Sequence, residues 1–133
     1  MSPIRVLVVD DSPIVCAALK RLLERDPEIH VVATALDAQS ALRAVSVHEP
    51  DIATVDLNMP GRDGVDFIGE LMHARPTPVL VVTADAKQPD AFEALRSGAL
   101  DVVGKPTVFG SEAGEEFCNR VKRLAGTPVI RRV

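Results

Sequence analysis

The chain has 133 residues, enough for one domain, and its 47% hydrophobic but only 3% aromatic content requires a core of aliphatic side chains. The formal net charge of −4 argues against a nucleic-acid or anionic-membrane partner, because binding to phosphates needs a basic surface. No apolar run approaches the roughly 18 residues of a membrane span, and the N-terminus lacks the arrangement of a signal peptide, so we expect a cytoplasmic protein.

Short apolar runs alternate with amphipathic segments along the chain. The runs predict β-strands at residues 4–9, 29–35, 52–55, 79–82 and 101–103. The amphipathic segments predict helices at residues 14–25, 38–48, 65–74, 89–97 and 112–124. Two of the strands contain the same continuously apolar run, VLVV, which is typical of a parallel sheet with helices on both faces. Five strand–helix units in this order predict a doubly wound α/β domain.

The two cysteines do not point to a metal site. Cys16 and Cys118 fall in predicted helices and lack the spacing of metal ligands. Cysteines in such positions are usually small buried hydrophobes, although a disulfide between them is compatible with the sequence.

Polar side chains follow four of the predicted strands at the point where each strand ends. Asp10 and Asp11 follow the first strand, Asp56 the third, Thr83 the fourth and Lys105 the fifth. The carboxyl ends of parallel strands lie at one edge of a sheet, where ligands bind in open α/β folds. We therefore expect these five side chains to line one cleft.

The acidic pair at the first strand end has two interpretations. Acids are common just before helices, but Ser12 and Pro13 already supply an N-cap and a first helical residue. Adjacent carboxylates repel each other, and hard oxygen ligands that leave room for water suit Mg²⁺. We therefore favour a Mg²⁺ site at Asp10, Asp11 and Asp56 over helix capping.

Asp56 ends an apolar strand, where an ionised carboxylate is costly to bury. An aspartate that begins a turn is the simpler alternative, but the turn residues Pro60, Gly61 and Gly64 come several positions later. Beside a cation, Asp56 stays ionised and is a candidate nucleophile toward phosphorus, which would form an aspartyl phosphate. The backbone carbonyl of Asn58 could bind the same cation.

The last two strand ends provide groups for a phosphoryl ligand. Thr83 can donate its hydroxyl to a phosphoryl oxygen, and the small Ala84 leaves the approach open. The compact ammonium of Lys105 suits phosphate oxygens, and Pro106 would restrict its direction, with either a trans or a cis bond between them. Each residue is ordinary by itself; their common edge makes the set a predicted phosphoryl site.

At these residues the chain resembles the receiver domain of two-component response regulators, over about residues 3–125. The matching stretches are VVDDSP, DLNMPGRDG, the pair Thr83-Ala84, and SGALDVVGKP, which ends at Lys105-Pro106. The resemblance implies a flavodoxin-like (βα)5 doubly wound parallel sheet with strand order 2-1-3-4-5. It also implies Mg²⁺-dependent phosphotransfer from a histidine kinase to Asp56. The metal ligands would be Asp10, Asp11, Asp56 and the Asn58 carbonyl, and the phosphoryl group would meet Thr83 and Lys105.

One residue departs from the family pattern. The family often has an aromatic residue within the segment GALDVV that rotates inward on activation, and this chain has Val102 there. We therefore expect the output to depend more on the loop after Thr83 and on the helix at 89–97.

A narrower resemblance rests on ARPTPVLVVTA, GALDVVGKP and the closing RVKRLAGTPVIRRV. These stretches are similar to the N-terminal regulatory domain of chemotaxis-type protein-glutamate methylesterases, in which a linker leads to a serine-hydrolase domain. We expect a receiver domain at residues 1–125 and the start of a linker at 126–133, without the effector domain. The implied partners are a chemotaxis-type histidine kinase and that effector domain, and the domain itself would be a monomer or weak dimer; a standalone receiver is the alternative.

Two other classes of function fit the sequence less well. A phosphohydrolase that uses an aspartyl phosphate commonly has a second acid two residues after the nucleophile, but this chain has Asn58 there, which cannot transfer protons in that way. A flavodoxin-like binding or scaffold module would leave the acidic cluster unexplained, and the chain has no Gly-rich phosphate loop after its first strand.

Overall fold

The computed structural model describes residues 2–59, 63–105 and 112–129 of the chain. Ten regular elements lie within these residues. The strands are β1 Ile4–Val9, β2 Ile29–Ala35, β3 Ile52–Val55, β4 Val79–Thr83 and β5 Asp101–Gly104. The helices are α1 Pro13–Leu23, α2 Ala38–His48, α3 Gly64–Ala74, α4 Pro89–Ser97 and α5 Glu112–Ala125. The predicted elements are confirmed, with ends that move by at most two residues. Within these described ranges, no helix has the length and apolar character needed to cross a membrane.

Side-chain caps define where the first helices begin. The Ser12 hydroxyl accepts a hydrogen bond from the Val15 N–H at 3.2 Å, and Pro13 follows as the first residue of α1. Asp37 caps α2 in the same way, by accepting from the Ser40 N–H at 2.7 Å. These caps satisfy backbone donors that a helix leaves free, so the polar residues before α1 and α2 specify the helix starts locally.

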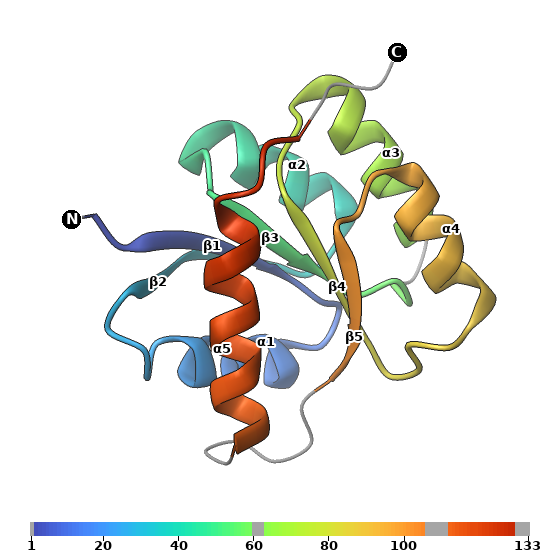
Figure 1. Ribbon diagram of the computed structural model, residues 1–133. Coiled ribbons are helices and arrows are strands. Elements are labelled where there is room, and N and C mark those ends of the chain that lie inside the picture. Colours follow the sequence, from blue (N-terminus) through green and yellow to red (C-terminus); the bar gives the residue numbers. More distant parts are fainter. Residues whose placement is uncertain (1, 60–62, 106–111, 130–133) are drawn as a thin grey trace.

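The strands form one sheet with the order β2-β1-β3-β4-β5, and every neighbouring pair is parallel. Figure 1 shows α1 and α5 on one face of this sheet and α2, α3 and α4 on the other. The flavodoxin-like order predicted from the resemblance is therefore confirmed. In this order β1 and β3 are central neighbours, which brings the residues after their carboxyl ends side by side.

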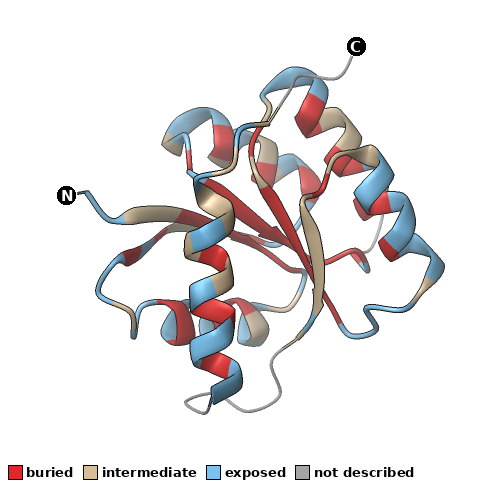
Figure 2. Cartoon of the chain, in the orientation of Figure 1, coloured by how far each residue is buried: buried red, intermediate tan, exposed pale blue. Residues whose placement is uncertain are grey.

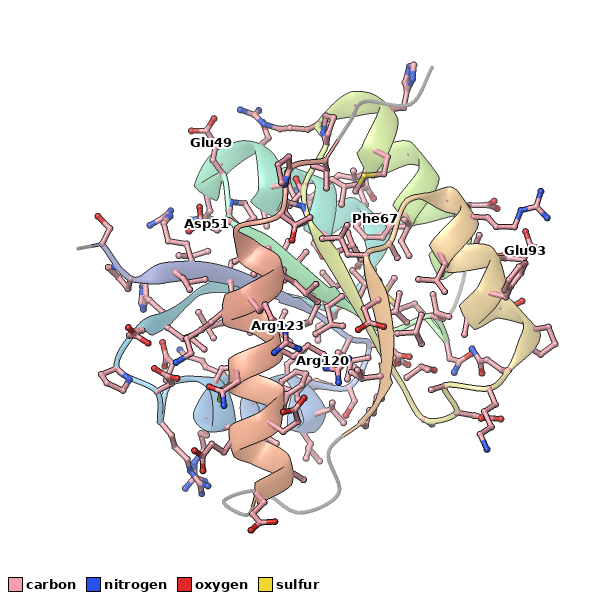
Figure 3. All side chains as sticks on the ribbon, viewed as in Figure 1. Glu49, Asp51, Phe67, Glu93, Arg120 and Arg123 are labelled. Atoms are coloured by element: carbon pink, nitrogen blue, oxygen red, sulfur yellow. The ribbon has the colours of Figure 1, made fainter. Side chains whose placement is uncertain are left out.

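Two apolar clusters hold the helices on the sheet. One lies under α2, α3 and α4 and includes Phe67, which is fully buried and labelled in Figure 3. The other lies under α1 and α5 and includes Leu23 and Val121. Figure 2 shows β3 and β4 buried along their length, whereas the outer faces of the helices are exposed. The continuous burial explains why these strands are apolar without alternation.

Two basic residues attach α5 to its neighbours through ion pairs. The Lys122 ammonium lies 2.7 Å from Asp26 and 2.8 Å from Glu28, which both lie in the loop between α1 and β2. Hydrogen bonding to Asp26 raises the pKa of Lys122 above its usual range. The Arg120 guanidinium pairs with Asp101 at the start of β5, and Figure 3 shows Arg120 on the side of α5 that faces this strand.

Both cysteines lie in the cluster under α1 and α5. Cys16 and Cys118 are 4% and 5% exposed, and both are free thiols. Burial raises the pKa of both thiols, because a thiolate is costly to desolvate. The prediction of small buried hydrophobes is confirmed, and no disulfide joins the two residues.

Thr54 on β3 leads to a prediction about stability. Its hydroxyl is buried and has no hydrogen-bond partner among the residues that the structure describes. Because an unpaired buried hydroxyl is destabilising, we expect Thr54→Val to raise the free energy of unfolding by about 1 kcal/mol, measured by urea denaturation. Thr34→Val, at an exposed position on β2, is the control and should change it little. A lower stability for Thr54→Val would mean that the hydroxyl has a partner, such as a buried water.

Candidate functional site

Three carboxylates meet beyond the carboxyl ends of β1 and β3. Val9 and Val55 are paired across these strands, and Asp10 and Asp56 follow them directly. The Asp56 N–H donates to the Val9 carbonyl at 3.0 Å, which extends the ladder by one residue. With Asp11 included, one oxygen from each carboxylate lies within 4.8 Å of the others. The structure thus brings together the three acids that the sequence predicted at this edge.

The two inner carboxylates are buried but hydrogen-bonded. Asp10 is 1% exposed and Asp56 is 4% exposed, whereas Asp11 is exposed. One oxygen of Asp10 accepts the Ser12 N–H at 2.9 Å, and one oxygen of Asp56 accepts the Asn58 N–H at 3.1 Å. Both bonds run from an aspartate to the backbone two residues later, a pattern that Asp favours. At Asp56 this is the turn-initiating role that the sequence offered as the simpler alternative, and here it occurs together with the acidic cluster. Each buried carboxylate is therefore oriented by its own loop.

Lys105 connects the two inner acids. Its ammonium nitrogen lies 2.9 Å from Oδ2 of Asp10 and 3.3 Å from Oδ2 of Asp56. The backbone of Lys105 is held in turn, because its N–H donates to the Thr83 carbonyl at 2.9 Å. Burial disfavours the charged form, but the hydrogen bond to Asp10 and the charge of Asp56 together raise the pKa of Lys105.

The charges at this site fit a divalent cation. In their ionised forms, three carboxylates and one ammonium have a formal charge of −3 + 1 = −2. The oxygens are hard ligands, and Asp11 lies on the solvent side, where water can complete the coordination of an ion. The arrangement could hold Mg²⁺ through Asp10, Asp11 and Asp56.

Thr83 and Asn58 form the other side of the site. Thr83 ends β4 and is fully buried, and its hydroxyl oxygen lies 3.5 Å from the side-chain nitrogen of Asn58, which donates to it. The sequence suggested a role only for the backbone carbonyl of Asn58, and nothing in the sequence indicated this side-chain contact. Ala84 is exposed, as an open approach requires. Pro106, and with it the isomer of its peptide bond, lies outside the described residues.

Comparison with known proteins identifies the class to which this fold and site belong. Residues 6–110 match the family model described as the response regulator receiver domain. The chain belongs to this family, whose members take part in two-component signalling.

Within this family, the chain is similar in sequence to the protein-glutamate methylesterases of chemotaxis. The chain is 42% identical to protein-glutamate methylesterase/protein-glutamine glutaminase 3 of Myxococcus xanthus, over 98% of this chain and 39% of that protein. It is 40% identical to the second such protein of Anaeromyxobacter dehalogenans, over 97% of this chain and 38% of that protein. The chain therefore spans about two fifths of the length of these relatives.

A solved structure agrees with these relatives. The response regulator domain of Thermotoga maritima CheB superposes on the chain with a TM-score of 0.84 and 30% identity, covering 95% of this chain and 98% of that domain. The receiver of the methylesterase family is thus the part of those proteins that this chain resembles.

Proposed function

We propose that the domain is a phosphorylation switch in which a histidine kinase transfers a phosphoryl group to Asp56 in the presence of Mg²⁺. One observation carries this proposal. The buried carboxylate of Asp56 shares a lysine ammonium with Asp10, at a site whose remaining charge of −2 suits a divalent cation. A structural ion pair alone would not need the third acid, Asp11, at an exposed position beside it.

In the proposed transfer, an oxygen of Asp56 forms a bond to phosphorus while the bond from phosphorus to the kinase's histidine nitrogen breaks. The electron pair of that broken bond stays on the imidazole nitrogen. Bound Mg²⁺ would supply positive charge to the phosphoryl oxygens, with Asp10, Asp11, Asp56 and the Asn58 carbonyl as its ligands. Because Oδ1 of Asp56 already accepts the Asn58 N–H, the carboxylate presents a defined orientation to the donor.

After transfer, Lys105 and Thr83 would bind the phosphoryl oxygens. Lys105 already lies 3.3 Å from the Asp56 carboxylate, so a small movement of its ammonium reaches a group on that oxygen. Thr83 would turn its hydroxyl proton toward the phosphoryl group, and the loop at residues 84–88, which is exposed at 84–87, would move with it. Val102, half-buried on β5, offers no aromatic ring to follow this movement, so the loop and α4 would transmit the signal.

The relatives indicate which output the switch would regulate. They are named as methylesterases and glutaminases, and this chain matches only about two fifths of each. Residues 1–125 would therefore control a hydrolase domain through a linker that begins at residue 126. Phosphorylation would change the contact between the receiver and that domain.

Intact-mass measurement tests the phosphoacceptor. Incubation with a small acyl phosphate and Mg²⁺ should add one phosphoryl group to the chain, and EDTA should prevent the addition. Asp56→Asn should take up no phosphoryl group, because an amide is not a nucleophile of this kind. Asp66→Asn, at an exposed position on α3, is the matched control and should be phosphorylated normally. An adduct that persists in Asp56→Asn would contradict the assignment.

A further inference from the structure

Gly64, the first residue of α3, lies against the backbone of Leu57. A Cβ atom built on Gly64 would lie 2.7 Å from the Cα of Leu57, 2.8 Å from its carbonyl oxygen and 3.1 Å from its carbonyl carbon. Cβ atoms essentially never lie closer than 3.0 Å to such an atom, and ordinary van der Waals contact begins at 3.4 Å, so the two segments would have to separate by about 0.3–0.7 Å to admit a side chain. All three atoms are backbone, so no rotamer change can relieve the contact.

The backbone that Gly64 touches is part of the proposed phosphoacceptor site. Leu57 stands between Asp56 and Asn58, and the peptide that joins Leu57 to Asn58 supplies the N–H that holds Oδ1 of Asp56 at 3.1 Å. The next carbonyl along the chain is that of Asn58, the expected backbone ligand of the metal. The Asn58 side chain also contacts Thr83. A shift of this one peptide would therefore move three features of the site together.

Neither segment is free to retreat from the other. Phe67, Ile68 and Leu71 anchor α3 in the core and are fully buried. Leu57 and Met59 are buried in the same cluster from the side of the loop. A close-packed interior resists separation, so a side chain at position 64 would distort the loop or the first turn of the helix.

We infer that Gly64 is a positioning residue of the phosphoacceptor site, because its missing side chain lets α3 support the Leu57–Asn58 peptide at the distance that the metal site needs. The inference rests on the proposed function. Functional groups must be held within about 0.5 Å of their working positions, and the displacement of about 0.3–0.7 Å that a Cβ requires is of the same size as that tolerance. The residue acts through the loop and does not touch the reacting atoms.

Three glycine-to-alanine variants of the chain separate this role from general destabilisation. Gly64→Ala introduces the contact with Leu57. Gly69→Ala lies in the same helix, and a Cβ there would meet nothing within 4 Å. Gly98→Ala disturbs packing elsewhere: Gly98 has a φ of +126°, and a Cβ there would lie 2.6 Å from the Cγ atom of Met72. Gly98 precedes the amino end of β5, whereas the site lies beyond the carboxyl ends of the strands. For each variant, urea denaturation, the Mg²⁺ dissociation constant from calorimetry and the rate of phosphorylation by a small acyl phosphate are measured.

We expect the Mg²⁺ dissociation constant of Gly64→Ala to rise by about 10- to 100-fold, as it does when groups that orient metal ligands are disturbed. The phosphorylation rate at a fixed Mg²⁺ concentration should fall with it. Gly98→Ala should lose stability but keep its Mg²⁺ affinity within about twofold, and Gly69→Ala should keep both. Alanine favours helices over glycine, so helix propensity cannot account for a loss that is specific to position 64.

Two results would overturn the inference: Mg²⁺ affinity in Gly64→Ala within twofold of Gly69→Ala, or an equal loss of affinity in Gly98→Ala. If Gly64→Ala does not fold, an NMR titration of the wild-type chain with Mg²⁺ tests the role of Gly64 instead. The Gly64 amide resonance should then shift together with that of Asn58, whereas the resonances of Gly69 and Gly98 should not, and an unchanged Gly64 resonance would exclude the role. If the wild-type chain binds no Mg²⁺ and accepts no phosphoryl group, the proposed function itself fails and the inference falls with it.

Discussion

Lys105→Met is expected to lower the free energy of unfolding by about 2–3 kcal/mol in the presence of EDTA. Removal of the ammonium leaves the buried carboxylates of Asp10 and Asp56 without their shared cation, and removal of one partner of a buried pair is strongly destabilising. The expected value lies below that of a fully buried pair because the lysine side chain is 28% exposed. Urea denaturation at neutral pH measures the loss.

Mg²⁺ should reverse about half of this loss relative to the wild type, because tenfold tighter binding is worth about 1.4 kcal/mol, and this connects the stability effect to the metal site. Without the lysine, the three carboxylates have a formal charge of −3 and should bind Mg²⁺ about 10-fold more tightly than in the wild-type chain. Binding to the folded state then stabilises the variant more than the wild type. Lys20→Met, at an exposed position on α1, is the control and should respond to Mg²⁺ as the wild type does. If Lys105→Met is equally stable with Mg²⁺ and with EDTA, the carboxylates do not share a cation.

Thr83→Val is expected to separate phosphorylation from switching. The substitution keeps the shape of the buried side chain but removes the hydroxyl that would bind a phosphoryl oxygen. Asp56 should still accept a phosphoryl group, because its nucleophilic oxygen and the acidic cluster are unchanged. A hydrogen bond to a charged group contributes about 1.5–3 kcal/mol, so the equilibrium between the resting and switched loops should shift back by about 10-fold or more.

NMR spectra of the loop at residues 84–88, recorded with Mg²⁺ and a beryllofluoride mimic of the phosphoryl group, measure this effect. The loop resonances should move in the wild-type chain and stay close to their resting positions in Thr83→Val. Thr54→Val is the matched control, because Thr54 is a buried threonine on the neighbouring strand β3 whose substitution should alter stability alone. A full loop response in Thr83→Val would exclude the hydroxyl as the connection between the site and the loop.

Much of this fold could be read from local patterns. The continuous apolar runs at β1 and β4 predict a sheet that is buried on both faces, and the Ser12-Pro13 pair predicts the start of α1. Such signals are local because the pleat, the helical repeat and the capping bonds each span only a few residues. The convergence of the acids at one sheet edge also followed from the sequence, because parallel strands place their carboxyl ends together.

The contacts within the site could not be predicted in the same way. The sequence predicts Lys105 at the same sheet edge as the acids and as a phosphate ligand, but its resting position between Asp10 and Asp56 depends on where β4 holds its backbone. The contact between Asn58 and Thr83 joins residues 25 positions apart, through two loops whose relative position is set by the packing of the core. Spacing along a chain carries no information about such distances.

Gly64 shows the difference between features that local sequence patterns predict and features that depend on three-dimensional packing. The order and types of residues were sufficient for the α/β class and for the sheet edge where Asp10, Asp11 and Asp56 meet, because these follow from periodicity and strand direction. The role of Asp56 as the acceptor stays a prediction. In the sequence Gly64 is only one more turn residue. The close approach of α3 to the Leu57 backbone became visible in three dimensions, because it results from the way Phe67, Leu71 and Leu57 fill one shared core.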